Sequence, residues 1–191
     1  SPSPEEEPKA PAASSKGPTA VIYKGPDGLE MNALYWKPKA RLAPGLLLLH
    51  HLGHNAWAFD DLARHLHQEG YAVLAVHLRG HPEAHVRKAG GLNWMRFALV
   101  DFQAIAKDVD AARACLAEQR EVDPLYLGLI GEQFGANLVL AGGTAETFRT
   151  AVLLSPSMNE RSLKSPEAMA SFTKPCLAVA SADDPQGAAT L

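Results

Sequence analysis

Continuous apolar runs, separated by segments of helical periodicity, constrain the fold more than any other feature of the sequence. GLLLLHH (45–51) and YAVLAVHL (71–78) have the length of strands, and AWAFDDLARHLHQEG (56–70) between them has the pattern of an amphipathic helix ending at Gly70. Strands that are apolar at consecutive positions are typical of a parallel sheet covered by helices on both faces. This region therefore predicts a strand–helix–strand unit.

The same alternation continues along the chain. Apolar residues at spacings of three and four predict a helix from about Phe97 to Gln119, and another helix follows Gln133. Further strands are expected at LYLGLIG (125–131), TAVLLSPS (150–157) and PCLAVASADD (175–184). TAVIYK (19–24) and LEMNALYW (29–36) flank the turn former GPDG and predict a β-hairpin. The whole pattern predicts a three-layer α/β sandwich with a mostly parallel sheet and an N-terminal β-hairpin.

Composition narrows the domain organisation and the partners. The 191 residues suit one domain, and a net charge of −3 argues against binding to nucleic acid. Residues 1–18, rich in Pro, Ser and Glu, predict a disordered tether, and residues 19–191 a single domain. No apolar stretch is long enough to span a membrane. The tether is compatible with export or a lipid anchor and equally with a cytoplasmic protein, so the localisation stays open. Cys115 and Cys176 are expected to be buried thiols.

Four motifs then carry a resemblance to a known family. They are LLLLHHLGHN (46–55), HLRGHPEA (77–84), GEQFG (131–135) and ASADDP (180–185), in this order. The chain from 19 to 191 resembles an α/β-hydrolase of the esterase and dienelactone-hydrolase type. The resemblance implies that the last strand and helix of that fold are missing from this sequence. The strand at 175–184 would then be an exposed sheet edge, which makes a homodimer through this edge possible.

The resemblance also assigns the site, with one departure at its centre. GEQFG corresponds to the nucleophile elbow, where a strand turns sharply into a helix, and Gln133 stands at the position of the Ser, Cys or Asp nucleophile. A primary amide cannot take that role. The resemblance implies backbone N–H donors of an oxyanion site at Leu52 and Phe134, and an acid at Asp183 or Asp184. An aspartate that forms a turn or caps a helix before Pro185 is the alternative.

The catalytic histidine expected after the acid has no counterpart, because all eight histidines lie between residues 50 and 85. Ser155 and Ser157 follow a strand at the same rim but lack the flanking glycines of an elbow, so they are poor substitutes for the nucleophile. Trp94 is expected either to cover the rim at a helix start or to anchor the core.

The histidines form a second group of candidate binding residues. Those after the two central strands, together with Glu132, are expected to converge on one rim of the sheet; the binding candidates are His50, His51, His54 and Glu132. His51, His54, His77 and His81 are candidate metal ligands, although HHxxH on a loop is not a known zinc motif. His51 and His77 replace the Gly and Asp usual in the family. The simpler expectation is a rim that gains positive charge as the pH falls through the histidine range.

Two functional hypotheses follow. The first is an α/β-hydrolase-like domain that is inactive by the usual triad and retains a pocket for a small acyl or carboxylate ligand or for a partner. The alternative is an active, esterase-like hydrolase, either through a metal-bound water at the histidine rim or as a truncated form of a longer enzyme. No cofactor is predicted.

Overall fold

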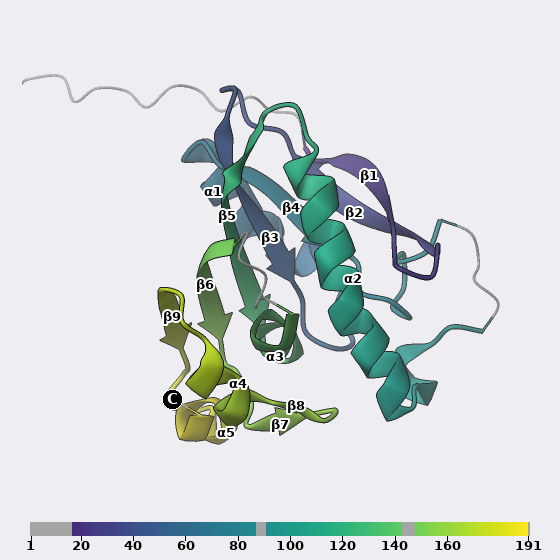
Figure 1. Cartoon of the computed structure of the whole chain (residues 1–191), viewed down its shortest axis with the longest axis vertical. Helices are drawn as coiled ribbons and strands as arrows, with labels where there is room; N and C mark the ends of the chain where they lie inside the picture. Colours follow the sequence, from purple (N-terminus) through teal and green to yellow (C-terminus); the bar gives the residue numbers. More distant parts are fainter. Residues whose placement is uncertain (1–16, 87–90, 143–147, 191) are drawn as a thin grey trace, which may run out of the picture.

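The computed structural model describes residues 17–86, 91–142 and 148–190, and a sheet of seven strands lies at its centre (Figure 1). The order across the sheet is β1-β2-β4-β3-β5-β6-β9. The strands are β1 (Thr19–Lys24), β2 (Glu30–Trp36), β3 (Ala43–Leu49), β4 (Ala72–Val76), β5 (Val122–Glu132), β6 (Phe148–Leu154) and β9 (Cys176–Val179). Residues 1–16 of the expected tether lie outside the described residues.

The strand directions confirm a mostly parallel sheet preceded by a hairpin. β1 pairs antiparallel with β2, and β2 pairs antiparallel with β4. From β4 onward, through β3, β5, β6 and β9, every neighbouring pair is parallel. The carboxyl ends of these five strands therefore meet at one rim of the sheet, where an α/β fold binds its ligands.

Helices cover both faces of the sheet, as the continuous apolar runs of the strands predict (Figure 1). α2 (Leu99–Ala117) and α3 (Phe134–Gly142) lie on one face, and α1 (Asp60–Gln68), preceded by the 3-10 turn η1 (Ala56–Phe59), lies on the other. Each face has its own hydrophobic cluster; Phe102 and Phe134 are buried in the first, and Phe59 in the second. This arrangement is the predicted three-layer sandwich.

Several short elements complete the described part of the chain. η2 (Trp94–Arg96) precedes α2, and α5 (Pro185–Thr190) follows β9. Between β6 and β9 lie a small two-stranded sheet and one helix, which the sequence did not predict: β7 (Asn159–Glu160), β8 (Leu163–Lys164) and α4 (Ser165–Ser171). These pieces are too short to show a hydrophobic period, and they pack on α3 at the rim of the parallel strands.

β9 is the outer strand of the described sheet, and this position corrects the expectation for one cysteine. Cys176 is exposed, not buried, because the apolar run of β9 lies at a sheet edge, where Leu177 (59% exposed) and Val179 (47%) also face outward. Cys115, on α2, is half-buried. An apolar run alone does not distinguish a central strand from an edge strand.

A cluster of charged side chains ties the hairpin to the helical layer. Arg79 follows β4 and donates two hydrogen bonds to Asp108 of α2, from Nε (2.8 Å) and Nη2 (2.7 Å). Its Nη1 and Nη2 also donate to Asp27 in the β1–β2 turn. The pKa of Asp27 falls to about 2, chiefly because of the hydrogen bond from Arg79. These bonds join three elements that are far apart in the sequence.

Among the described helices, none combines the length and apolar character that crossing a membrane requires.

Candidate functional site

Gln133 lies where β5 turns directly into α3, in a left-handed backbone conformation with φ of 48°. The turn is too tight for a side chain on either flanking glycine. A Cβ on Gly135 would lie 2.0 Å from the carbonyl oxygen of Leu49, and one on Gly131 would lie 2.3 Å from that of Gly135. The backbone N–H of Gln133 donates to the carbonyl of Leu154 (2.8 Å), which fixes the turn against β6. The close approach of β3, β5 and β6 at this turn therefore explains why residues 131 and 135 are glycines.

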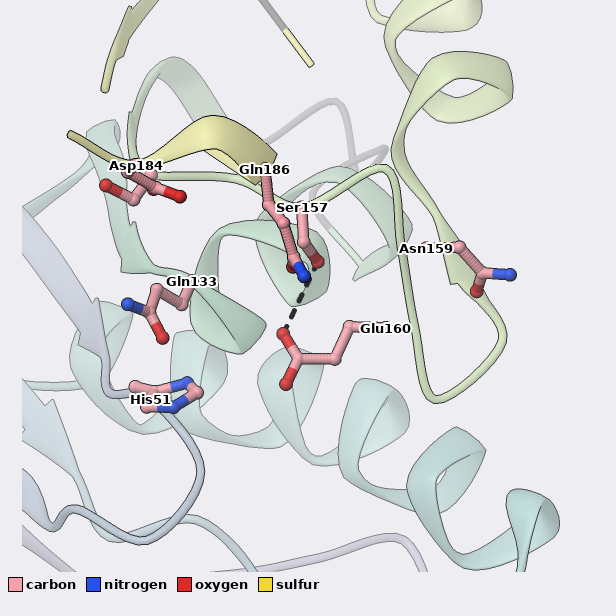
Figure 2. Close-up of a pocket in the computed structure, with 8 residues that line it drawn as sticks. His51, Gln133, Ser157, Asn159, Glu160, Asp184 and Gln186 are labelled. Atoms are coloured by element: carbon pink, nitrogen blue, oxygen red, sulfur yellow. Dashed lines mark hydrogen bonds between the residues drawn. The ribbon is translucent and has the colours of Figure 1, made fainter. Parts of the chain in front are cut away.

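A cavity of about 260 Å³ opens above this turn (Figure 2). The carboxamide of Gln133 is directed into it, with Asp184 and His51 on either side (Figure 2). All eight lining residues are polar, and none is Lys or Arg. They are His51, Gln133, Ser155, Ser157, Asn159, Glu160, Asp184 and Gln186. The lining thus consists of side chains that can form hydrogen bonds.

The two predicted oxyanion donors border the turn. Leu52 lies in the loop after β3, and Phe134 is the first residue of α3, whose first N–H groups have no partner within the helix. Among the described residues no hydrogen-bond acceptor pairs with the N–H of Leu52 or of Phe134. Neither residue is among those that line the cavity above the turn, so their role as oxyanion donors stays a prediction.

The two candidate acids differ in position. Asp184 lines the cavity, whereas Asp183 is exposed and does not. A carboxylate oxygen of Asp184 accepts the backbone N–H of Gly187 (3.0 Å), so this residue also caps α5. The hydrogen bond from Gly187, followed by one from the Ser155 hydroxyl, lowers the pKa of Asp184. Asp184 therefore caps α5 and faces the cavity, whereas its assignment as the acid of the family stays a prediction.

Ser155 is the second residue with a left-handed backbone at the cavity, also with φ of 48°. It follows β6 directly, and its N–H donates to the carbonyl of Val179 (2.7 Å). Its hydroxyl bonds to Asp184, but a carboxylate with a lowered pKa is a weak base for activating a serine. Ser155 therefore serves as a hydrogen-bond donor in this arrangement.

Asn137 on α3 holds the outer wall of the cavity. Its side chain is buried, and its Nδ2 donates to the carbonyls of Ser157 and Leu163, both at 2.9 Å. Its Oδ1 accepts the backbone N–H of Ser157 (3.1 Å). These bonds fix both ends of the segment 157–163, which supplies Ser157, Asn159 and Glu160 to the cavity.

The histidines after β3 and β4 converge as predicted, but four of the six already accept a backbone N–H. His50 accepts the N–H of Leu78 (3.0 Å), and His81 accepts that of Gly53 (3.0 Å). His77 and His85 likewise accept the N–H groups of Ala56 (3.3 Å) and Gly80 (3.1 Å). A ring nitrogen that accepts an N–H is unavailable to a metal ion. These four side chains therefore fix the loops between the strands and the helices.

The remaining candidates do not complete a metal site. His51 packs edge-on against His54, and Nδ1 of His54 lies 3.8 Å from a carboxylate oxygen of Glu132. Across residues 17–86, 91–142 and 148–190, no three His, Cys, Asp or Glu side chains come together in a group able to hold a metal ion. The four metal candidates His51, His54, His77 and His81 are thus close in space without forming a ligand set.

The expected gain of positive charge at this rim is wrong for the buried histidines. Burial lowers the pKa of His50 to about 3 and that of His81 to about 4. Burial also lowers the pKa values of His51, His77 and His85. The rings of His50 and His81 therefore stay neutral in the range in which an exposed histidine titrates. His81 is further enclosed by Trp94, whose ring stacks on it at 5.3 Å between centroids.

Sequence reasoning missed four residues of this site. Asn159, Glu160 and Gln186 line the cavity, and Asn137 supports it. One signal was available, because the first three follow the carboxyl ends of β6 and β9, at the rim where ligands bind in such folds. Their side chains gave no sign of which would face inward.

The comparisons with known proteins agree with this geometry. A parallel sheet between helices, with a strand–turn–helix at the head of its central strand, defines the class of α/β-hydrolases. The family described as serine aminopeptidase, S33, matches residues 42–185. The chain belongs to this family of α/β-hydrolases. No curated protein matches the sequence.

Solved structures share the fold at low sequence identity. They include DcsB in complex with its substrate analogue (15% identity, TM-score 0.64) and the α/β-hydrolase GrgF from Penicillium sp. sh18 (19%, 0.62). A third is the esterase Pf2001 of Pyrococcus furiosus (20%, 0.60). The matches cover 74%, 75% and 74% of this chain but only 46%, 48% and 53% of those chains, in the same order. The chain thus spans about half the length of these structures.

Proposed function

We propose that this α/β-hydrolase domain does not cleave esters or amides through an acyl-enzyme and instead binds a small polar ligand in the cavity above Gln133. The observation that carries the proposal is the residue at the turn. The backbone presents the side chain of residue 133 to the cavity, and that side chain is a carboxamide. Its nitrogen has no usable lone pair and its oxygen is a poor nucleophile, so no covalent intermediate forms there.

The remaining features of the cavity support binding. The carboxamide of Gln133 lines the cavity and offers a hydrogen bond to an oxygen atom of a ligand. Two non-glycine residues in left-handed conformations, Gln133 and Ser155, border the same cavity. Such backbone conformations cost about 1–3 kcal/mol each and concentrate at functional sites. A cavity of about 260 Å³ lies just below the roughly 300–1,000 Å³ of sites for drug-sized ligands, which favours a smaller molecule.

The catalytic alternative through a metal-bound water gains no support from the described residues, because they form no group of three ligands. The test is hydrolysis of p-nitrophenyl acetate with and without added zinc. We expect rates at the background of the buffer in both cases and no change on Gln133→Ala. Turnover that needs zinc, or that Gln133→Ala abolishes, would contradict the proposal.

A second experiment asks whether another nucleophile acts in the cavity. A fluorophosphonate probe is expected to leave the protein unlabelled, whereas labelling of Ser155 or Ser157 would show an overlooked hydrolase. Gln133→Cys provides the control for access. We expect iodoacetamide to modify the introduced thiol, identified by peptide mass spectrometry apart from Cys115 and Cys176. If the introduced thiol stayed unmodified, the cavity would be closed to small molecules.

A further inference from the structure

The wall of the cavity carries two carboxylates and no permanently charged cation. Glu160 comes from β7, and Asp184 precedes α5, so two separate segments supply them. The other six lining side chains are amides, hydroxyls and one imidazole. The described residues that line the cavity thus supply no permanent positive charge.

Each carboxylate is held by neutral donors alone. Asp184 accepts the N–H of Gly187 and the hydroxyl of Ser155, and Glu160 accepts the hydroxyl of Ser157 (3.4 Å). Among the ion pairs between described residues, none joins a Lys or Arg to Glu160 or Asp184. Hydrogen bonds of this kind orient a carboxylate and leave its charge uncompensated.

Two basic side chains, Arg161 and His51, do not supply the missing positive charge. Arg161 follows Glu160 in the sequence, but its guanidinium lies over the ring of Phe102, 5.2 Å from the centroid, and does not line the cavity. His51 does line the cavity, and burial lowers its pKa, so its ring is neutral at neutral pH. Its Nδ1 is buried and has no hydrogen-bond partner among the described residues. The site therefore combines uncompensated negative charge with an unused hydrogen-bonding atom.

We infer that the ligand of this cavity is a small organic ammonium ion that also carries a neutral oxygen, as in an amino alcohol or an amino amide. This inference rests on the proposed function, namely that the cavity binds a ligand. The charges of Glu160 and Asp184 attract the ammonium group, and the oxygen accepts from the Gln133 carboxamide. It replaces the expectation of a carboxylate ligand, since a carboxylate would meet two like charges.

The experiment uses three probes with the same two-carbon frame. All three contain a hydroxymethyl group. The other end of the molecule is an ammonium in ethanolamine hydrochloride, a hydroxyl in ethylene glycol and a carboxylate in sodium glycolate. Each is titrated at pH 7 into the ¹⁵N-labelled protein, and binding is measured from the shifts of the backbone amides around the cavity. We expect ethanolamine to bind at least fivefold more tightly than ethylene glycol, and glycolate to bind most weakly. Added salt should weaken ethanolamine binding only.

Matched variants locate the charge effect. Glu160→Gln and Asp184→Asn keep the hydrogen-bonding shape, and Asn is itself a good helix cap. Each is expected to weaken ethanolamine about fivefold, the upper range for an exposed ion pair, and to leave ethylene glycol unchanged. Glu118→Gln, an exposed acid just past the end of α2, is the control and should change neither. The same spectra report whether each variant is folded.

The outcomes separate this inference from the proposed function. Tighter binding of glycolate, or ethanolamine binding unaffected by both acid variants, would overturn the inference about charge and leave a ligand-binding cavity standing. Shifts for none of the three probes would overturn both. Hydrolytic turnover in the ester assay would overturn the proposed function. The titrations would still measure whether the cavity prefers an ammonium group.

Discussion

At the scale of single residues, Gln133 is the point at which backbone geometry and side-chain chemistry disagree. The turn between β5 and α3 requires φ of 48°, which disfavours every residue except glycine, yet the position holds a large polar side chain. A glycine here would relieve the strain. Retaining a carboxamide at this cost is consistent with a side chain that contacts a ligand, because strain of this kind collects at functional sites.

This reasoning predicts the effect of Gln133→Gly on stability. We expect the free energy of unfolding to rise by about 1 kcal/mol, measured by urea denaturation, because glycine adopts positive φ without a steric penalty. The matched control is Gln103→Gly, an exposed position inside α2, where the same substitution should lower stability by about 1 kcal/mol. Destabilisation by Gln133→Gly would show that the carboxamide supports the fold and not a ligand.

At the scale of elements, the β7–β8 hairpin is attached to α3 largely through one buried side chain. Asn137→Leu removes the partners of the Ser157 and Leu163 carbonyls and of the Ser157 N–H. Because buried groups left without partners cost about 1–3 kcal/mol each, we expect the three unpaired groups to lower the free energy of unfolding by at least about 3 kcal/mol. Amide exchange across 157–163 should also accelerate.

The control for that variant is Asn159→Ala, an exposed asparagine on the hairpin itself. Its removal should change stability by no more than about 0.5 kcal/mol. If the two variants were equally stable, the hairpin would not depend on Asn137. If Asn137→Leu lowered stability without faster exchange in 157–163, its bonds would serve the core and not the cavity wall.

Also at this scale, the sequence predicts the elements of the sheet far better than the elements of the site. Long apolar runs such as those of β3 and β4 report burial on both faces, and the glycines around Gln133 report a tight turn. β7 and β8 have two residues each, and their place depends on Asn137, which looks like any asparagine of a helix. The exposure of Cys176 likewise depends on which strand is outermost.

At the scale of the whole molecule, the buried histidines make stability depend on pH. His50 and His81 lie between the sheet and its loops, and each ring accepts a backbone N–H from the neighbouring segment. Their pKa values in the folded protein, about 3 and about 4, are below the ordinary value of 6.5, with burial as the main cause. Between these values the unfolded chain binds protons that the folded chain does not.

The sign of the effect follows directly: the contribution of these rings to stability is complete above about pH 6.5 and is lost as the pH falls. Each histidine that charges only on unfolding costs about 1.4 kcal/mol per pH unit, so we expect the free energy of unfolding to fall by about 2–3 kcal/mol per unit between pH 6 and pH 4.5. Urea denaturation at several pH values measures this slope.

His81→Gln removes one titrating ring and should reduce the slope by about 1.4 kcal/mol per unit, whereas His65→Gln, on the exposed surface of α1, should leave it unchanged. An unchanged slope for His81→Gln would show that His81 is already protonated in the folded protein. A protonated ring could not accept the N–H of Gly53, so the loop bearing Leu52 would not be held by a neutral imidazole.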